Sequence, residues 1–208
     1  SRRNNPIEAS RVIDAVIAYA RANPDHSLGV ITFNESQKTL IEAEADRRGR
    51  ENVEIAALLA DHGAEGFFVK NIENVQGDER DAIFLSVGFG RTPDGKLSMN
   101  FGPISTEGGE RRLNVAVTRA RHAMAVVSSV LPGDLRFPAE TRRGPRLTRE
   151  YLEYAQSGGG ARPSRPVGQE GLEGAVEAAL VAAGLRARRH LGRYEYAVDL
   201  AVFDPDDP

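Results

Sequence analysis

The sequence of 208 residues contains no cysteine and no tryptophan. The lack of cysteine excludes disulfide bonds and thiolate metal sites. No apolar run approaches the roughly 20 residues that a membrane-spanning helix needs. The residues from Ser1 to Pro6 have no apolar core of the kind found in a signal peptide. We therefore expect a cytoplasmic protein with no membrane partner.

The chain also lacks an excess of positive charge, because 27 lysines and arginines against 30 acidic residues leave a net charge of −3. This excludes a uniformly basic protein that coats nucleic acid, although a narrow basic track remains compatible with it. The content of hydrophobic residues, 40%, is ordinary for a globular protein. The length suits one full domain of about 150 residues and a fragment of a second.

Strands and helices are predicted to alternate over residues 1–156, which we expect to form one domain. Such alternation predicts an α/β fold with a mainly parallel sheet flanked by helices. In such sheets ligands bind at the carboxyl ends of the strands, so we expect the site there. Short apolar runs predict strands over 28–32, 67–69, 82–87 and 123–128, and helical spacing predicts helices over 7–22, 34–47, 51–61, 110–121 and 146–156.

The composition changes after residue 156. Residues 157–167 are rich in glycine, proline and serine, which predicts a linker. Beyond it, apolar spacing predicts a helix over 172–184 and a strand over 194–203. Residues 168–208 are too few to close a core, so we expect a truncated second domain.

Two clusters of polar residues each precede a predicted buried strand. In the run from Gln76 to Asp81, Gly77 permits a tight turn and Glu79 can accept hydrogen bonds from a sugar hydroxyl. In the run from Leu113 to Arg121, an arginine that faces a nucleotide would stabilise the charge of phosphoryl transfer. Taken alone, the first cluster also fits a surface loop, and the second also fits a solvated basic helix face.

Together, in this order and spacing, the clusters resemble motifs V and VI of superfamily 1 helicases. The likeness is to the 5′-to-3′ branch that includes the nonsense-mediated-decay helicases. Residues 29–37 are similar to motif IV, although Phe33-Asn34 stands where Pro-Tyr is usual. The resemblance covers about residues 4–156 and implies the second RecA-like domain of a helicase.

The resemblance implies a role for individual residues at an ATP site shared between two domains. Glu79 matches the acid that binds the ATP ribose, and Arg119 matches the arginine finger that reaches the γ-phosphate. Gln37 matches the glutamine near the nucleotide. Gln76 and Gly77 match the turn that couples the nucleotide to the bound strand.

Four further positions follow from the same resemblance. Thr32 and Thr118 either contact the nucleic-acid backbone or support residues that do, while Asn114 and Arg121 hold the motif VI helix against the sheet. The sequence has no G-x-x-x-x-G-K-[ST] phosphate loop and no Asp-Glu metal-binding strand of the Walker type. We therefore expect ATP and Mg²⁺ to need a first RecA-like domain upstream, and this chain alone to be inactive.

The C-terminal segment resembles the opening of a PD-(D/E)xK restriction-endonuclease-like domain. Glu173 on the predicted helix and Asp199 in the predicted strand match the first two acids of that fold, and Asp199 would hold Mg²⁺. The alternative is that Glu173 is a solvated helix residue and Asp199 an edge-strand acid.

The sequence thus predicts an ATP-dependent helicase that translocates on single-stranded nucleic acid. DNA is expected rather than RNA, because a restriction-type nuclease partner acts on DNA. Two alternatives stay open, which are a nucleic-acid clamp that does not hydrolyse ATP and a scaffold for a metal-dependent nuclease.

Overall fold

The structure is a computed structural model, which describes residues 4–60, 65–92, 94–158, 181–182, 186–191 and 198–203. The chain divides into two compact units, Ser1–Gly160 and Ala161–Pro208, and each contains its own sheet. The first unit contains, in chain order, α1 (Pro6–Ala22), β1 (Leu28–Thr32), α2 (Glu35–Glu51), α3 (Val53–Leu58), β2 (Phe68–Asn71), β3 (Arg80–Ser86), the 3₁₀ turn η2 (Gly102–Ser105), α4 (Gly109–Val117), β4 (Ala120–Val127), the 3₁₀ turn η3 (Pro132–Asp134) and α5 (Arg143–Gln156).

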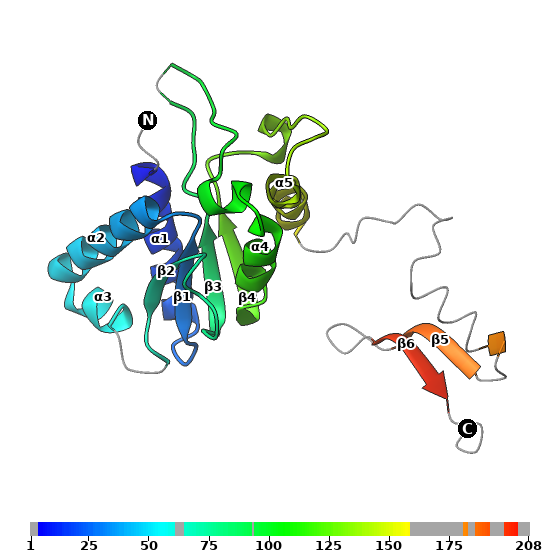
Figure 1. The fold of residues 1–208 in the computed structure, drawn as a ribbon. Helices are drawn as coiled ribbons and strands as arrows, with labels where there is room; N and C mark the ends of the chain where they lie inside the picture. Colours follow the sequence, from blue (N-terminus) through cyan, green and yellow to red (C-terminus); the bar gives the residue numbers. More distant parts are fainter. Residues whose placement is uncertain are drawn as a thin grey trace. The chain divides into compact units, whose positions relative to one another are not determined.

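The sheet of the first unit has four strands in the order β2-β1-β3-β4, and every pair is parallel (Figure 1). The predicted α/β fold with a parallel sheet flanked by helices is therefore confirmed. Most of its predicted elements match the observed ones within a few residues. One connection is unusual, because residues 72–79 lead from β2 to β3 without a helix.

Local sequence explains where the two long N-terminal helices begin. The side chain of Asn5 accepts a hydrogen bond from the Glu8 N–H, and Pro6 occupies the first turn of α1. In the same way, the side chain of Asn34 accepts from the Gln37 N–H at the start of α2. Asn34 follows β1 after one residue, so α2 turns back along the sheet at this cap.

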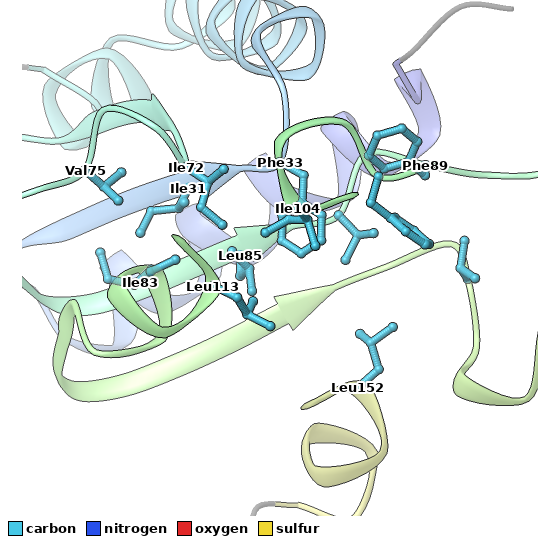
Figure 2. Close-up of a cluster of buried hydrophobic side chains, with 14 of the residues drawn as sticks. Ile31, Phe33, Ile72, Val75, Ile83, Leu85, Phe89, Ile104, Leu113 and Leu152 are labelled. Carbon is cyan, nitrogen blue, oxygen red and sulfur yellow. The ribbon is translucent and has the colours of Figure 1, made fainter. Parts of the chain in front are cut away.

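Alternate residues of the central strands feed two separate cores, one on each face of the sheet. Val30 and Phe84 pack with α1 and α2, whereas Ile31, Ile83 and Leu85 point to the opposite face. Figure 2 shows this second core, to which α4 contributes Leu113, α5 contributes Leu152, and the segment between β2 and β3 contributes Ile72 and Val75. The helices therefore cover both faces of the sheet and leave its two ends for polar residues. We call the end at which the parallel strands begin the amino edge, and the end at which they finish the carboxyl edge.

Two sequence predictions need correction. The helix predicted over 110–121 ends at Val117, and residues 120–127 already form β4. Arg119 and Arg121 are thus not helical, because the chain leaves α4 at Thr118 in order to enter the sheet. Residues 90–109 are rich in glycine, proline, serine and threonine, which predicts a long loop, but they contain a bridge between Arg91 and Leu97 and the turn η2.

The second unit contains two described strands, β5 (Arg186–Leu191) and β6 (Val198–Phe203), which pair antiparallel. β6 falls within the predicted strand over 194–203, whereas β5 was not predicted. The helix predicted over 172–184 lies outside the described residues except at 181–182, which are helical. None of the described helices is long and apolar enough to cross a bilayer.

Candidate functional site

The segment 72–79 crosses the sheet from the carboxyl end of β2 to the amino end of β3. Ile72 and Val75 are buried and anchor it to the core, whereas Gln76 and Glu79 are exposed. Gly77 has a φ of +88°, a backbone conformation that side chains disfavour. The turn that the sequence predicted at Gly77 is therefore present, and it presents two polar side chains to solvent.

Arg119 lies between the end of α4 and the start of β4. Its Nε donates to the Val115 carbonyl at 3.0 Å, and its Nη2 donates to the Thr118 hydroxyl at 3.1 Å. The guanidinium thus lies over the last turn of α4, on a carbonyl that also accepts from the N–H and the hydroxyl of Thr118. This position orients the arginine without using its third nitrogen.

That third nitrogen brings the two sequence clusters together. Arg119 Nη1 lies 3.4 Å from Glu79 Oε1, and the two side chains are 19% and 49% exposed. Both residues directly precede strands whose first residues, Arg80 and Ala120, are paired. Glu79 and Arg119 therefore meet at the amino edge of the sheet, and the expected location at the carboxyl ends is wrong for them.

Arg80 is a residue of this edge that the sequence reasoning missed. It is 7% exposed, its Nη1 donates to the Glu79 carbonyl at 2.7 Å, and its Nε donates to the Gly66 carbonyl at 2.9 Å. Its backbone N–H donates to the Arg119 carbonyl at 3.1 Å, and its guanidinium lies 4.8 Å from the Phe68 ring centre. One buried side chain thus fixes the backbone beside both predicted nucleotide residues.

Arg121 and Asn114 lie close to this edge without joining the pair. Arg121 forms ion pairs with Glu65 at 3.1 Å and with Asp81 at 3.7 Å. Hydrogen bonds from the backbone and the hydroxyl of Ser27 lower the pKa of the Asp81 carboxyl. Asn114 is exposed on α4, and its carbonyl accepts from the Thr118 N–H.

Gln37 and Thr32 lie at the opposite, carboxyl edge, and both are fully buried. The Gln37 side chain accepts from the Asn5 N–H at 2.7 Å and donates to the Asn5 carbonyl and the Ser86 hydroxyl, both at 3.3 Å. The Thr32 hydroxyl donates to the Asn34 carbonyl at 2.9 Å. Both side chains are therefore engaged inside the chain, and a direct contact from Gln37 to a ligand would require these bonds to open.

Glu8 completes this carboxyl edge, and nothing in the sequence pointed to it except its place in the first turn of a helix. Its carboxylate accepts from the Gly88 N–H at 2.6 Å, the Ser86 hydroxyl at 2.8 Å and the Ser129 N–H at 3.0 Å. Burial raises the pKa of Glu8, and these hydrogen bonds counteract the rise. The carboxylate thus joins the ends of β3 and β4 to α1.

The two predicted nuclease acids are not brought together by what the structure describes. Glu173 lies outside the described residues, and Asp199 lies on β6, of which the backbone is described. The prediction of a metal site at Asp199 therefore stays a prediction.

Comparison with known proteins gives matches over the N-terminal part of the chain. The model of a family described as AAA domain matches residues 1–131. An uncharacterized ATP-dependent helicase, MG140, of Mycoplasma genitalium is 43% identical over 133 residues. Its homolog in Mycoplasma pneumoniae is 41% identical over the same length. Each match covers 63% of this chain but only 12% of the relative.

Proposed function

The chain belongs to this AAA domain family, and on that premise we propose that residues 1–156 form the second RecA-like motor domain of a superfamily 1, ATP-dependent helicase. Both curated relatives carry the name ATP-dependent helicase, which supports the proposal. The observation that carries it is the meeting of Glu79 and Arg119, which come from two motifs and lie within 3.4 Å at one edge.

The residues at this edge fit an adenosine triphosphate. Glu79 is half exposed, so its carboxylate can accept hydrogen bonds from ribose hydroxyls. Arg119 is held along α4, and it would move its guanidinium from Glu79 to the γ-phosphate. The positive φ of Gly77 leaves the backbone beside Glu79 open to close approach. Bound ATP with Mg²⁺ supplies the phosphoryl group whose developing charge such an arginine stabilises.

The crossing segment 72–79 connects this edge with the carboxyl edge. We propose that Gln76, exposed in the segment, and Thr118, exposed beside Arg119, contact the nucleic acid or residues that do. Thr32 and Gln37 would act from the buried carboxyl-edge network rather than at the surface. A movement of Glu79 can be transmitted to that network along residues 72–79, because the buried Ile72 and Val75 fix the course of this segment.

Other parts of the protein would complete the motor. We propose that an upstream RecA-like domain supplies the phosphate-binding loop and the metal-binding acid, since this sequence contains neither motif. Residues 168–208 would begin a nuclease-like module, with Glu173 and Asp199 as its first acids, which favours DNA over RNA as the strand.

ATP turnover by the full-length protein tests the proposal. Wild-type turnover should rise when single-stranded nucleic acid is added. The substitution Arg119→Ala should lower the stimulated rate about 10³-fold or more, because the γ-phosphate loses its positive partner. The thermal unfolding temperature of Arg119→Ala should stay close to that of the wild type, since Arg119 is a partly exposed side chain at a helix end.

Arg50→Ala is the matched control, because Arg50 is an exposed arginine on α2, far along the chain from both motifs. It should keep wild-type turnover. Undiminished turnover in Arg119→Ala would contradict the finger role. Tight strand binding without any turnover in the wild type would overturn the motor and favour the clamp or the nuclease scaffold.

A further inference from the structure

The residues that the helicase resemblance assigns to nucleic acid do not form one surface. Thr32 is buried at the carboxyl edge, Thr118 is exposed near the amino edge, and Gln76 lies on the segment between the edges. A strand that runs over this domain therefore needs a contact surface that these three residues do not provide.

An open groove of about 580 Å³ lies between the loop that follows β3 and the segment that leads into α5. Ser98, Asn100 and Ser105 line one wall, and Glu140, Thr141 and Arg142 line the other. Both walls belong to segments that leave the sheet at the carboxyl ends of β3 and β4. The groove thus lies on the carboxyl side, away from Glu79 and Arg119.

The polar side chains of the first wall offer donors. Backbone N–H groups of the same loop already occupy the acceptor atoms: Asn100 N–H donates to Ser98 Oγ at 3.2 Å, Gly102 N–H to Asn100 Oδ1 at 2.9 Å, and Phe101 N–H to Ser105 Oγ at 2.8 Å. Among the described residues, the side-chain N–H₂ and O–H groups of Ser98, Asn100 and Ser105 have no acceptor. A matching ligand must therefore supply acceptors, as phosphate oxygens do.

The segment 136–146, which contributes Arg142 and Glu140 to the second wall, carries an excess of positive charge. The eleven residues 136–146 contain four arginines, at positions 136, 142, 143 and 146, against one acid, Glu140. All four arginines are exposed, and within the described part of the chain none of them forms an ion pair. This excess stands out in a chain of net charge −3.

Three of these arginines do not serve the stability of their own helix. Arg142 occupies the N-cap position of α5 without a side-chain capping hydrogen bond, and Arg143 and Arg146 belong to its first turn. Positive side chains at this end oppose the helix dipole. Arg142 lines the groove, and Arg143 follows it directly, so their charge is suited to an anionic ligand there.

The two walls are held against each other by close packing. A Cβ atom on Gly144 would lie 2.1 Å from the Ile104 carbonyl oxygen, so α5 approaches η2 as closely as only glycine allows. Thr148, buried one turn later, donates to the Gly144 carbonyl at 3.0 Å. The groove is therefore pre-organised, which lowers the cost of binding.

We infer that this groove binds the sugar–phosphate backbone of a single-stranded nucleic acid, with Arg142 and Arg143 at phosphates and Asn100 donating to a phosphate oxygen. Met99, 37% exposed in the groove wall, gives an unpaired base an apolar surface. The inference rests on the proposed function and adds a contact surface outside the helicase motifs.

Salt-dependent strand binding by the full-length protein tests the inference. Fluorescence anisotropy of a labelled single-stranded oligonucleotide would be measured over a series of salt concentrations. The double variant Arg142→Ala/Arg143→Ala should lose about tenfold in affinity at physiological salt. Its log–log salt slope should fall by about 1.4, because each lost phosphate contact removes about 0.7 for a single strand.

The variant Asn100→Asp tests the donor argument at constant shape. It keeps the acceptor for the Gly102 N–H but replaces the free N–H₂ with a charged oxygen, so strand binding should weaken.

In ATP turnover, the double variant Arg142→Ala/Arg143→Ala should raise the strand concentration for half-stimulation about tenfold and keep the maximal rate. The thermal unfolding temperature should not fall, since the removed charges oppose the α5 dipole.

Arg50→Ala, which removes an exposed arginine from α2, is the control. It should keep the wild-type affinity for the strand and the wild-type salt slope. Unchanged affinity and slope in the double variant, with normal strand binding by the wild type, would overturn the groove and leave the motor proposal intact. Failure of the wild-type protein to bind any strand would overturn the proposed function, and the groove with it.

Discussion

At the scale of single residues, Arg80 shows how a buried charge can serve backbone geometry. Replacement by methionine keeps a long side chain beside Phe68 but leaves the Glu79 and Gly66 carbonyls without their donors. The bond to the Gly66 carbonyl is the buried one, and an unpaired buried acceptor costs about 1–3 kcal/mol, so we expect Arg80→Met to lower the free energy of unfolding by about that amount. Urea unfolding followed by circular dichroism measures it.

Arg80→Lys provides the comparison, because lysine keeps a cation near Phe68 but cannot bridge both carbonyls. Its loss of stability should be smaller than that of Arg80→Met. Equal urea midpoints for wild type and Arg80→Met would show that solvent replaces these hydrogen bonds and that Arg80 does not fix this edge.

Residue contacts across the chain were the least predictable feature. Glu79 and Arg119 could be related only through the helicase resemblance, because nothing in their own neighbourhoods shows that β3 and β4 are adjacent. His26 and His122 lie far apart in the sequence, yet their ring centres lie 5.5 Å apart. Spacing along a chain predicts faces of helices and strands, whereas such pairs depend on strand order.

At the scale of secondary-structure elements, the boundary between α4 and β4 was missed for a local reason. Leu113 and Ala116 follow helical spacing, and no glycine or proline marks the end of the helix. The chain stops the helix at Thr118 because the following residues gain backbone hydrogen bonds in the sheet. Tertiary pairing, rather than propensity, sets this boundary.

The helix α2 carries a pH-dependent contribution to stability. Hydrogen bonds from Arg47, aided by Arg48, lower the pKa of Glu44 from 4.5 to about 2. The folded state therefore binds fewer protons than the unfolded state between these values, and stability falls as the pH falls through this range. We expect Glu44→Gln to cost about 1 kcal/mol at neutral pH, as a helical ion-pair network does.

The difference between wild type and Glu44→Gln should shrink as the pH falls from 4.5 to 2, which urea midpoints at a series of pH values would show. Asp46→Asn is a suitable control, because it removes an exposed charge from the same helix without breaking a described ion pair. A constant difference across the acid range would contradict the role of Glu44.

At the scale of the whole molecule, the sequence predicted a parallel α/β sheet but not the end of the strands at which Glu79 and Arg119 lie. In open α/β sheets ligands generally bind beyond the carboxyl ends of the strands. In this chain Glu79 and Arg119 precede their strands, so they face the amino side. The structure brings Glu79 and Arg119 together at the amino side, whereas the sequence analysis expected a site at the carboxyl ends. Their assignment to an ATP site stays a prediction.

The second unit allows a prediction that separates two activities of the full-length protein. If Asp199 on β6 holds Mg²⁺ for phosphodiester cleavage, Asp199→Ala should abolish metal-dependent cleavage of DNA. It should leave strand-stimulated ATP turnover at the wild-type rate, because the two units have separate sheets and the turnover residues lie in the first. Asp199→Asn, which keeps the shape but loses the charge, should also be inactive in cleavage. Cleavage that survives in both variants would exclude Asp199 as a metal ligand, and the DNA preference would lose its support.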